Sequence, residues 1–229
     1  MLRLTFLGTS ASVPSAERNH PALLVEAGGH RILVDCREGT QRQLLRSGAG
    51  FRRLHRLLLT HAHFDHILGI PGLFSTLRLR QSDDLLTVHG GSDTLDVVVR
   101  MLAGLWGEGR APMPLTLEPL TPGRFFDADE FVIACFQVRH RDTDVLAEHV
   151  RGADLLVIEA TFLERDAAMA RDYGHLTAAQ AASLAATSNV KQLILTHISG
   201  RYAAEEILAE AARAFPNSRI AADLDVLTI

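Results

Sequence analysis

The sequence predicts an α/β fold in which sheets are covered by helices. Short apolar runs rich in β-branched residues alternate with longer segments whose apolar residues recur at helical spacing. The expected strands of the first half follow one another closely, whereas strands and helices alternate in the second half. This mixture favours a layered α/β sandwich. A chain of 229 residues is expected to form one domain, or two halves that share a core.

The same patterns place the expected elements along the chain. Gly28 and Gly29 separate two strand-like runs, which predicts a tight hairpin. Thr177 precedes an alanine-rich helical pattern and is expected to be its N-cap. We expect strands over residues 2–8, 22–27, 31–36, 56–60, 85–90, 131–138, 154–160, 192–197 and 225–229. We expect helices over residues 39–47, 66–80, 93–106, 177–187 and 203–214.

Composition narrows the class of protein. The two cysteines, Cys36 and Cys135, supply neither a disulfide framework nor a thiolate zinc site, which favours a reducing, cytoplasmic location. No apolar run approaches the roughly 20 residues that a membrane-spanning helix needs. The net charge of −4 argues against a general polyanion binder. Arginines cluster at positions 37, 42, 46, 52, 53, 56, 78 and 80, a pattern typical of a solvated helix face that leaves a local nucleic-acid-binding patch open as the alternative.

The segment THAHFDHILG, residues 60–69, follows an apolar run and contains three histidines and an aspartate. Alternate side chains of an extended chain point the same way, so His61 and His63 can converge on one metal ion. Asp65 continues that alternation, and His66 faces elsewhere, toward a second ion. Two metal ions about 3.5–4 Å apart are the usual clamp for phosphoester hydrolysis. Imidazole and carboxylate ligands without thiolate favour zinc, and manganese or iron are compatible with them.

HAHFDH resembles the signature of the metallo-β-lactamase superfamily. Further segments, in the same order along the chain, resemble the ribonuclease Z family, whose members remove the 3′ trailer from precursor tRNA: DCREGTQ (35–41), EATF (159–162), GHLT (174–177) and THISGRY (196–202). The resemblance runs through nearly the whole chain. It implies a single metallo-β-lactamase-like domain over residues 1–229, a four-layer αββα sandwich, and it implies precursor tRNA as the substrate.

The resemblance also assigns ligands for two zinc ions per chain. His61, His63 and His140 would bind one ion, and Asp65, His66 and His197 would bind the other. Asp142, in Arg-Asp-Thr, is the candidate for the aspartate that bridges the two ions. Asp35 matches a family aspartate that supports the ligands from behind.

The family's chemistry assigns roles to further residues. Metal-activated hydroxide would attack the phosphorus, with Asp65 orienting or deprotonating it. His175 would protonate the leaving 3′-oxygen, and Glu159 would hold that imidazole. The remaining matches imply substrate contacts by Arg18, Asn19, Ser199 and Arg201.

The chain departs from the family's pattern at two places. In PSAERN (14–19), Ala16 stands where a lysine is usual. The family also has a hairpin, and often a tRNA-grasping arm, between the residues that match His140 and Asp142, but here these are two positions apart and the next motif begins at Gly152. Two strands of about five residues each do not fit in that interval. The hairpin or arm region between about 140 and 152 is therefore expected to be truncated or missing.

Three functions remain open from the sequence. The first is a zinc-dependent endonuclease of the ribonuclease Z type that acts on precursor tRNA, which the family leads us to expect as a homodimer in the cytoplasm. The second is an arm-less metallo-hydrolase of small phosphodiesters or sulfate esters, because metal and water chemistry does not specify the size of the leaving group. The third is a non-catalytic metal-binding protein. Asp65, Glu159 and His175 weigh against the third.

Overall fold

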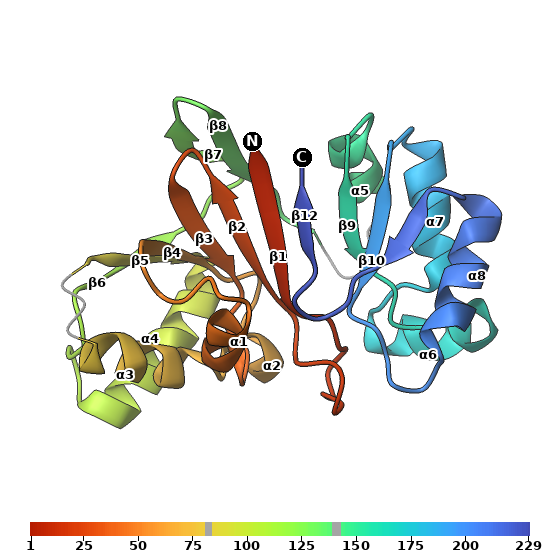
Figure 1. Ribbon diagram of the computed structural model, residues 1–229. Coiled ribbons are helices and arrows are strands. Elements are labelled where there is room, and N and C mark those ends of the chain that lie inside the picture. Colours follow the sequence, from red (N-terminus) through yellow and green to blue (C-terminus); the bar gives the residue numbers. More distant parts are fainter. Residues whose placement is uncertain (81–83, 139–142) are drawn as a thin grey trace. The chain divides into compact units, whose positions relative to one another are not determined.

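The computed structural model describes residues 1–80, 84–138 and 143–229 of the chain (Figure 1). Contacts between residues divide it into two units. Unit 1 comprises Met1–Gly8, Asn19–Phe136 and Asp223–Ile229, and unit 2 comprises Thr9–Arg18 and Gln137–Ala222. Each unit has its own sheet and its own buried apolar cluster. The expectation of one domain over residues 1–229 stays a prediction.

Unit 1 is built on a seven-stranded sheet. Neighbours at one end of the sheet are antiparallel, and those from β3 onward are parallel. The predicted hairpin joins β2 to β3 through Gly28 and Gly29, whose positive φ angles of 53° and 79° suit glycine. The strand order is β12 (Val226–Thr228), β1 (Leu2–Gly8), β2 (Ala22–Ala27), β3 (His30–Val34), β4 (Leu54–Leu58), β5 (Leu86–Gly90) and β6 (Leu115–Pro119).

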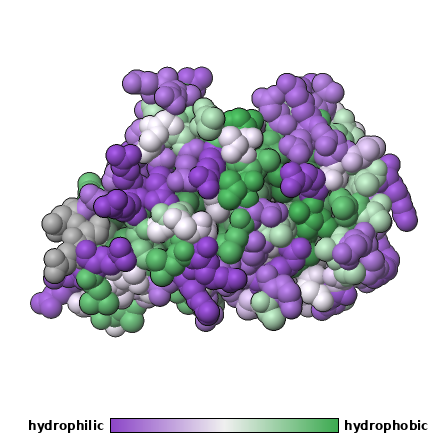
Figure 2. Space-filling model, viewed as in Figure 1, coloured by the Kyte–Doolittle hydropathy of each residue, from purple (hydrophilic) through white to green (hydrophobic). Residues whose placement is uncertain are grey.

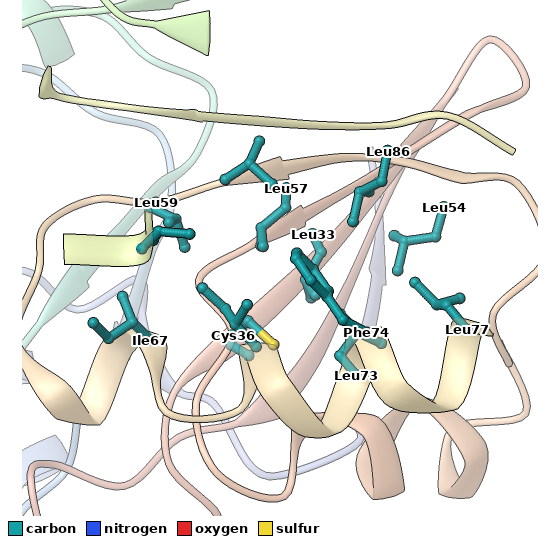
Figure 3. Close-up of a cluster of buried hydrophobic side chains, with 14 of the residues drawn as sticks. Leu33, Cys36, Leu54, Leu57, Leu59, Ile67, Leu73, Phe74, Leu77 and Leu86 are labelled. Atoms are coloured by element: carbon teal, nitrogen blue, oxygen red, sulfur yellow. The ribbon is translucent and has the colours of Figure 1, made fainter. Parts of the chain in front are cut away.

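Helices pack their apolar side chains against this sheet. In Figure 3, Phe74 and Leu77 of one helix point toward Leu33 and Leu54 of the strands. Phe74 and Leu33 have no exposed surface, so the centre of the cluster is dry. The helices of unit 1 are α1 (Thr40–Arg46), α2 (Phe64–Ile67), α3 (Ile70–Leu79) and α4 (Ser92–Trp106), and β7 (Gly123–Ala128) pairs with β8 (Phe131–Cys135) as a separate hairpin.

The helix expected over residues 66–80 is two helices in the structure. α2 ends at Ile67 and α3 begins at Ile70. Pro71 has no N–H to donate to the carbonyl of Ile67, and its ring crowds that carbonyl, so one continuous helix is unfavourable. The Gly69 N–H, between the two helices, donates to the Cys36 carbonyl at 2.9 Å and not to a carbonyl of α2. The break lets the HAHFDH segment end in one short turn before the longer helix begins.

Unit 2 is a three-stranded parallel sheet with helices beside it. The order is β11 (Ser218–Ile220), β10 (Leu193–Thr196) and β9 (Leu156–Glu159). Alanines of one helix make much of its buried cluster. Thr177 caps that helix as predicted, accepting from the Gln180 N–H at 3.1 Å. The helical elements are α5 (Thr143–Val150), the short 3₁₀ helix η1 (Glu164–Asp166), α6 (Ala167–Tyr173), α7 (Ala178–Thr187) and α8 (Ala204–Ala214).

Six elements of the described residues were not expected from the sequence, and most are short or weakly patterned. They are β6, β7, α5, η1, α6 and β11. Within the described part of the chain, the half-exposed β7 pairs only with its hairpin partner, and β11 has three residues, so neither leaves a strong apolar run. The helix α5 occupies Thr143–Val150, so this part of the interval between positions 140 and 152 is helical and contains no hairpin.

Helix length decides whether a segment could span a bilayer. The helix α4 has 15 residues, whereas a spanning helix needs about 20 apolar ones. No helix in residues 1–80, 84–138 and 143–229 is long and apolar enough to cross a membrane. Hydrophilic residues cover much of the face shown in Figure 2.

The buried cluster of unit 1 can be tested at Phe74. We expect Phe74→Ala to lower the free energy of unfolding by about 3–5 kcal/mol, because it removes a fully buried ring and leaves a cavity. Phe64→Ala, at a side chain that is 72% exposed, should change it by less than about 0.5 kcal/mol. Trp106, the single tryptophan, packs against this cluster, so its fluorescence during urea unfolding reports on unit 1. Equal losses in the two variants would contradict the assigned core.

Candidate active site

The histidines of HAHFDH gather directly after β4, in unit 1. The Nε2 atom of His61 lies 3.0 Å from Nδ1 of His63, and the rings of His61 and His66 have centroids 3.8 Å apart. Asp65 and His66 lie in the first turn of α2, where the His66 N–H donates to the His63 carbonyl at 2.8 Å. The four side chains predicted from this segment therefore lie within one small region of the unit.

Asp35, at the end of β3, organises this region. Its carboxylate accepts hydrogen bonds from the Thr60 N–H at 2.9 Å and the Thr60 hydroxyl at 2.9 Å, and it lies 2.7 Å from Nδ1 of His66. The residue has a left-handed backbone, with φ of 59°, a conformation that aspartate tolerates better than most residues. Asp35 thus holds the Nδ1 side of His66 and leaves Nε2 as the side that can bind a metal. This contact agrees with the supporting role expected for Asp35.

The region fits a zinc ion at His61 and His63. Two imidazole nitrogens bound at about 2.0–2.1 Å in a tetrahedral site lie roughly 3.3 Å apart, close to the 3.0 Å between these two atoms. Burial, followed by the nearby His66, lowers the pKa of His61 to about 4. The His61 ring is therefore neutral at pH 7, as a metal ligand must be.

Arg37 is the residue of this region that the sequence did not reveal. It was expected to belong to a solvated arginine face, and that expectation is wrong: its side chain is only 1% exposed. Its guanidinium donates to Asp65 Oδ2 at 2.8 Å and contacts both ring nitrogens of His66. Burial lowers the pKa of Arg37 to about 10, so it remains a cation at neutral pH. No sequence signal separates it from the exposed arginines that follow, because its partners are 28 and 29 residues away.

Unit 2 places three predicted side chains together at the carboxyl ends of its strands. Glu159 ends β9, and His197 follows β10 directly. These strands are parallel neighbours in which Thr196 pairs with Glu159, so the two side chains emerge at the same edge. His197 has a left-handed φ of 57°, an uncommon conformation that marks it as constrained. Ligand-type atoms of Glu159, His175 and His197 all lie within 4.8 Å of one another.

Glu159 and His175 make a direct hydrogen bond. The Oε2 atom of Glu159 lies 2.8 Å from Nδ1 of His175. The loop that carries His175 is fixed because the His175 N–H donates to the Ala170 carbonyl at 2.8 Å and Phe162 bridges to Thr177. A carboxylate on Nδ1 sets the tautomer of the ring and stabilises its protonated form. The contact suits a proton donor, and that role, which the family resemblance implies for this pair, stays a prediction.

Thr161 joins this pair to His197, and the sequence did not predict its role. Its hydroxyl donates to Glu159 Oε2 at 2.6 Å and lies 2.8 Å from Nδ1 of His197. Because the single hydroxyl proton goes to the carboxylate, the oxygen accepts from Nδ1–H of His197. Nε2 of His197 is then the nitrogen with the lone pair that a metal needs. EATF carries the threonine, but only the fold shows which groups it reaches.

The remaining predicted residues are distributed as follows. The Arg18 guanidinium donates to the Thr9 hydroxyl and to the Ala221 carbonyl, both at 2.6 Å, so it ties parts of unit 2 together. The Asn19 side chain, in unit 1, donates to the Glu38 carbonyl at 3.1 Å. Arg201 is exposed and contacts the Met169 sulfur at 3.0 Å, and the Ser199 hydroxyl accepts from the Arg201 N–H at 3.3 Å. His140 and Asp142 lie outside the described residues.

Solved structures identify the fold. The chain matches the metallo-β-lactamase fold protein YhfI from Bacillus subtilis with a TM-score of 0.83 at 19% identity, covering 99% of this chain and 98% of that one. It matches the human tRNase Z short form with a TM-score of 0.81 at 26% identity, covering 99% of each chain. Together with the imidazole and carboxylate clusters, these matches define a metal-dependent hydrolase of the metallo-β-lactamase fold, as predicted.

Sequence relatives identify the family. Ribonuclease Z of Bradyrhizobium diazoefficiens is 56% identical over 301 aligned positions that cover both chains in full. Ribonuclease Z of Archaeoglobus fulgidus is 30% identical and covers 100% of this chain and 98% of its own. Residues 2–172 match the family model described as Anti-Pycsar protein Apyc1. The chain belongs to the ribonuclease Z family, and its residues 2–172 also match this family model.

The role of Thr161 can be tested through metal affinity. We expect Thr161→Val to weaken zinc binding about 10- to 100-fold, because it removes the hydroxyl that orients His197 and Glu159. Competition with a chromophoric zinc chelator would measure the change. Thr161→Ser keeps the hydroxyl and should bind zinc within a fewfold of the wild type. If the valine variant binds zinc as tightly as the serine variant, the hydroxyl does not orient a ligand.

Proposed function

We propose that this chain is an endoribonuclease that removes the 3′ trailer from precursor tRNA by hydrolysis of one phosphodiester bond. Membership of the ribonuclease Z family carries the substrate assignment. The direct 2.8 Å contact between Glu159 and His175 is the structural observation that carries the chemistry. When the P–O3′ bond of RNA breaks, the 3′-oxygen leaves as an alkoxide that needs a proton, and this pair is placed to give one.

Different side chains of this protein carry out the two proton transfers of the reaction. Protonated His175 donates from Nε2 to the leaving 3′-oxygen, while Glu159 on Nδ1 stabilises the imidazolium before the transfer. Thr161 keeps Glu159 in place through its hydroxyl. Asp65 orients the attacking water and accepts its proton. We assign Glu159, His175 and Asp65 as the catalytic residues.

We further propose that the ligand set is that of a dinuclear zinc enzyme. His61 and His63 would hold one ion, and Asp65, His66 and His197 would contribute to the other; the family pattern adds His140 and Asp142. When bound, the metal supplies a nucleophile at neutral pH by acidifying water, and it offsets charge on the phosphoryl oxygens. The 3.0 Å spacing of His61 and His63, and the neutral state of His61, support this assignment.

We propose that this chain contacts tRNA through a smaller surface than its relatives do. The alignment with the Bradyrhizobium protein spans 301 positions, whereas the chain has 229 residues, so that relative has residues without counterparts here. The missing hairpin or arm is assigned to the interval between positions 140 and 152, where α5 begins at Thr143. Arg18, Asn19, Ser199 and Arg201 are the proposed substrate contacts. We also propose a cytoplasmic homodimer, whose mass light scattering would measure.

Substrate preference tests the proposal. We expect the zinc-loaded chain to cut precursor tRNA next to the acceptor stem, and to release a product with the mature 3′ end. Sequencing of the product ends would show the position of the cut. Bis(p-nitrophenyl) phosphate serves as the small phosphodiester for comparison. If the small ester is hydrolysed and precursor tRNA stays intact, the protein is instead a hydrolase of small phosphodiesters.

The leaving group tests the role of the Glu159–His175 pair. We expect Glu159→Gln and His175→Ala to lower kcat on precursor tRNA by about 10²-fold or more, because the alkoxide then leaves without a proton. Bis(p-nitrophenyl) phosphate releases a weakly basic aryloxide, so its hydrolysis should fall less than about 10-fold. Glu164→Gln, at an exposed carboxylate near by in sequence, is the control. Equal losses on both substrates would show that the pair does not act as the proton donor.

A further inference from the structure

Tyr202 ends the THISGRY segment and is buried in unit 2. Only 9% of the residue is exposed, and it belongs to the buried apolar cluster of this unit. Its hydroxyl donates to Asp166 Oδ2 at 2.6 Å, a short hydrogen bond of the kind that a charged acceptor makes. Its N–H donates to the Ser199 carbonyl at 3.4 Å, within the turn that follows His197. The hydroxyl is therefore placed relative to that turn.

Asp166 stands at the start of α6, the helix that supports the loop of His175. It is the N-cap residue of this helix, so Asp166 and Ala170 are about one helical turn apart, roughly 6 Å along the axis. The Ala170 carbonyl accepts the His175 N–H at 2.8 Å. A single turn of helix thus connects the carboxylate that Tyr202 holds to the carbonyl that holds His175.

The turn after His197 contacts α6 at a second place. Nη1 of Arg201 lies 3.0 Å from the Met169 sulfur, and the Arg201 side chain is exposed. A thioether sulfur is a weak acceptor, whereas the carboxylate of Asp166 is a strong one. The bond from Tyr202 to Asp166 is therefore the stronger of the two contacts.

The distance between His175 and His197 matters for the chemistry of the proposed function. Their rings have centroids 5.0 Å apart. His175 gives a proton to the leaving oxygen and His197 is assigned to a metal ion, so their separation sets where the proton donor stands relative to the phosphoryl group. A misplacement of about 1 Å can cost about 100-fold in rate. Glu159 fixes the ring of His175 at Nδ1, and α6 holds its backbone.

We propose that the hydrogen bond from Tyr202 to Asp166 positions the loop of His175 against the turn that follows His197. Tyr202 and Asp166 are positioning residues, which act through the first turn of α6. Their bond serves the proton transfer and not metal binding, because Thr161 orients His197. This inference rests on the proposed function, which assigns the proton transfer to His175, and it adds two residues that place the donor.

Tyr202→Phe tests the inference, because it removes one hydroxyl and keeps the buried ring. We expect kcat on precursor tRNA to fall about 10-fold while KM stays within about twofold, since the alkoxide needs a proton from a correctly placed His175. Hydrolysis of bis(p-nitrophenyl) phosphate should change by less than about twofold, because its aryloxide leaves without that proton. Zinc affinity, measured by competition with a chromophoric chelator, should also stay within about twofold.

Variants of Asp166 and Arg165 complete the comparison. Asp166→Ala removes the acceptor and should give the same losses as Tyr202→Phe, and the double variant should lose no more than either single one. Asp166→Asn keeps an oxygen that accepts the bond and should lose less. Arg165→Met is the control: it removes the guanidinium that lies 5.3 Å from the centre of the Tyr202 ring and leaves the hydroxyl bond intact, so its kinetics should match the wild type.

Hydrogen exchange of the His175 amide gives a measurement that needs no turnover. This N–H donates to Ala170, so a loosened α6 should expose it more often. We expect Tyr202→Phe to speed its exchange about 5-fold or more, which is the effect of losing one hydrogen bond. Exchange of the amides of β10, which lies in the sheet of unit 2, should stay unchanged.

Three results would overturn the inference. They are equal losses on precursor tRNA and on the small ester, losses that multiply in the double variant, and an unchanged exchange rate of the His175 amide. If Tyr202→Phe does not fold, Asp166→Ala and the same measurements decide the question. If the wild type leaves precursor tRNA intact, the substrate assignment fails, and the exchange measurement still decides this inference.

Discussion

The buried carboxylate of Asp35 is the contact on which the arrangement of unit 1 depends. It joins the end of β3 to the turn after β4 and to the first turn of α2, because it binds Thr60 and His66 at the same time. A buried charge of this kind is tolerated only when its hydrogen bonds are satisfied and a cation is near. Thr60, His66 and the adjacent Arg37 meet these needs. The same groups hold His66 in one orientation, so the contacts that stabilise the fold of unit 1 also position this histidine.

Each unit positions one histidine with the same kinds of residue, a threonine and a carboxylate. In unit 1, the Thr60 hydroxyl lies between a carboxylate, Asp35, and an imidazole, His66, at 2.9 and 3.2 Å. In unit 2, the Thr161 hydroxyl lies between Glu159 and His197 at 2.6 and 2.8 Å. A threonine next to the end of a strand is short and stiff, so it fixes both neighbours with little freedom. In both units the hydroxyl lies against Nδ1 of the imidazole.

Much of the fold and of the candidate site could be predicted from the sequence, and the features that could be predicted are local ones. The histidines and aspartate of HAHFDH lie within six positions, so the alternation of an extended chain already brings two of them together. Thr177 and the Gly28–Gly29 hairpin are local signals in the same sense, and both predictions are confirmed. The grouping of Glu159, His175 and His197 followed from the family resemblance, because these residues are far apart in sequence and have no shared periodicity.

The contacts that were missed depend on the fold. Thr161 reaches His197 across 36 positions, and Arg37 reaches His66 across 29. Charge patterning assigned Arg37 to a solvated face because it precedes a run of arginines that are largely exposed, and nothing in its neighbours marks it as buried. The helical spacing of apolar residues likewise predicted one helix over residues 66–80, although Pro71 interrupts that helix. In each case a long-range contact or a missing N–H outweighed the local pattern.

The burial of Arg37 is difficult to explain by stability alone. A buried ion pair gains little over well-packed apolar residues, because the desolvation of both charges offsets their attraction. Its two carboxylate neighbours, Asp35 and Asp65, lie in one small region of unit 1, so they repel each other and need a cation. Arg37 supplies that cation from within the chain. The guanidinium therefore offsets the charge of both carboxylates within unit 1.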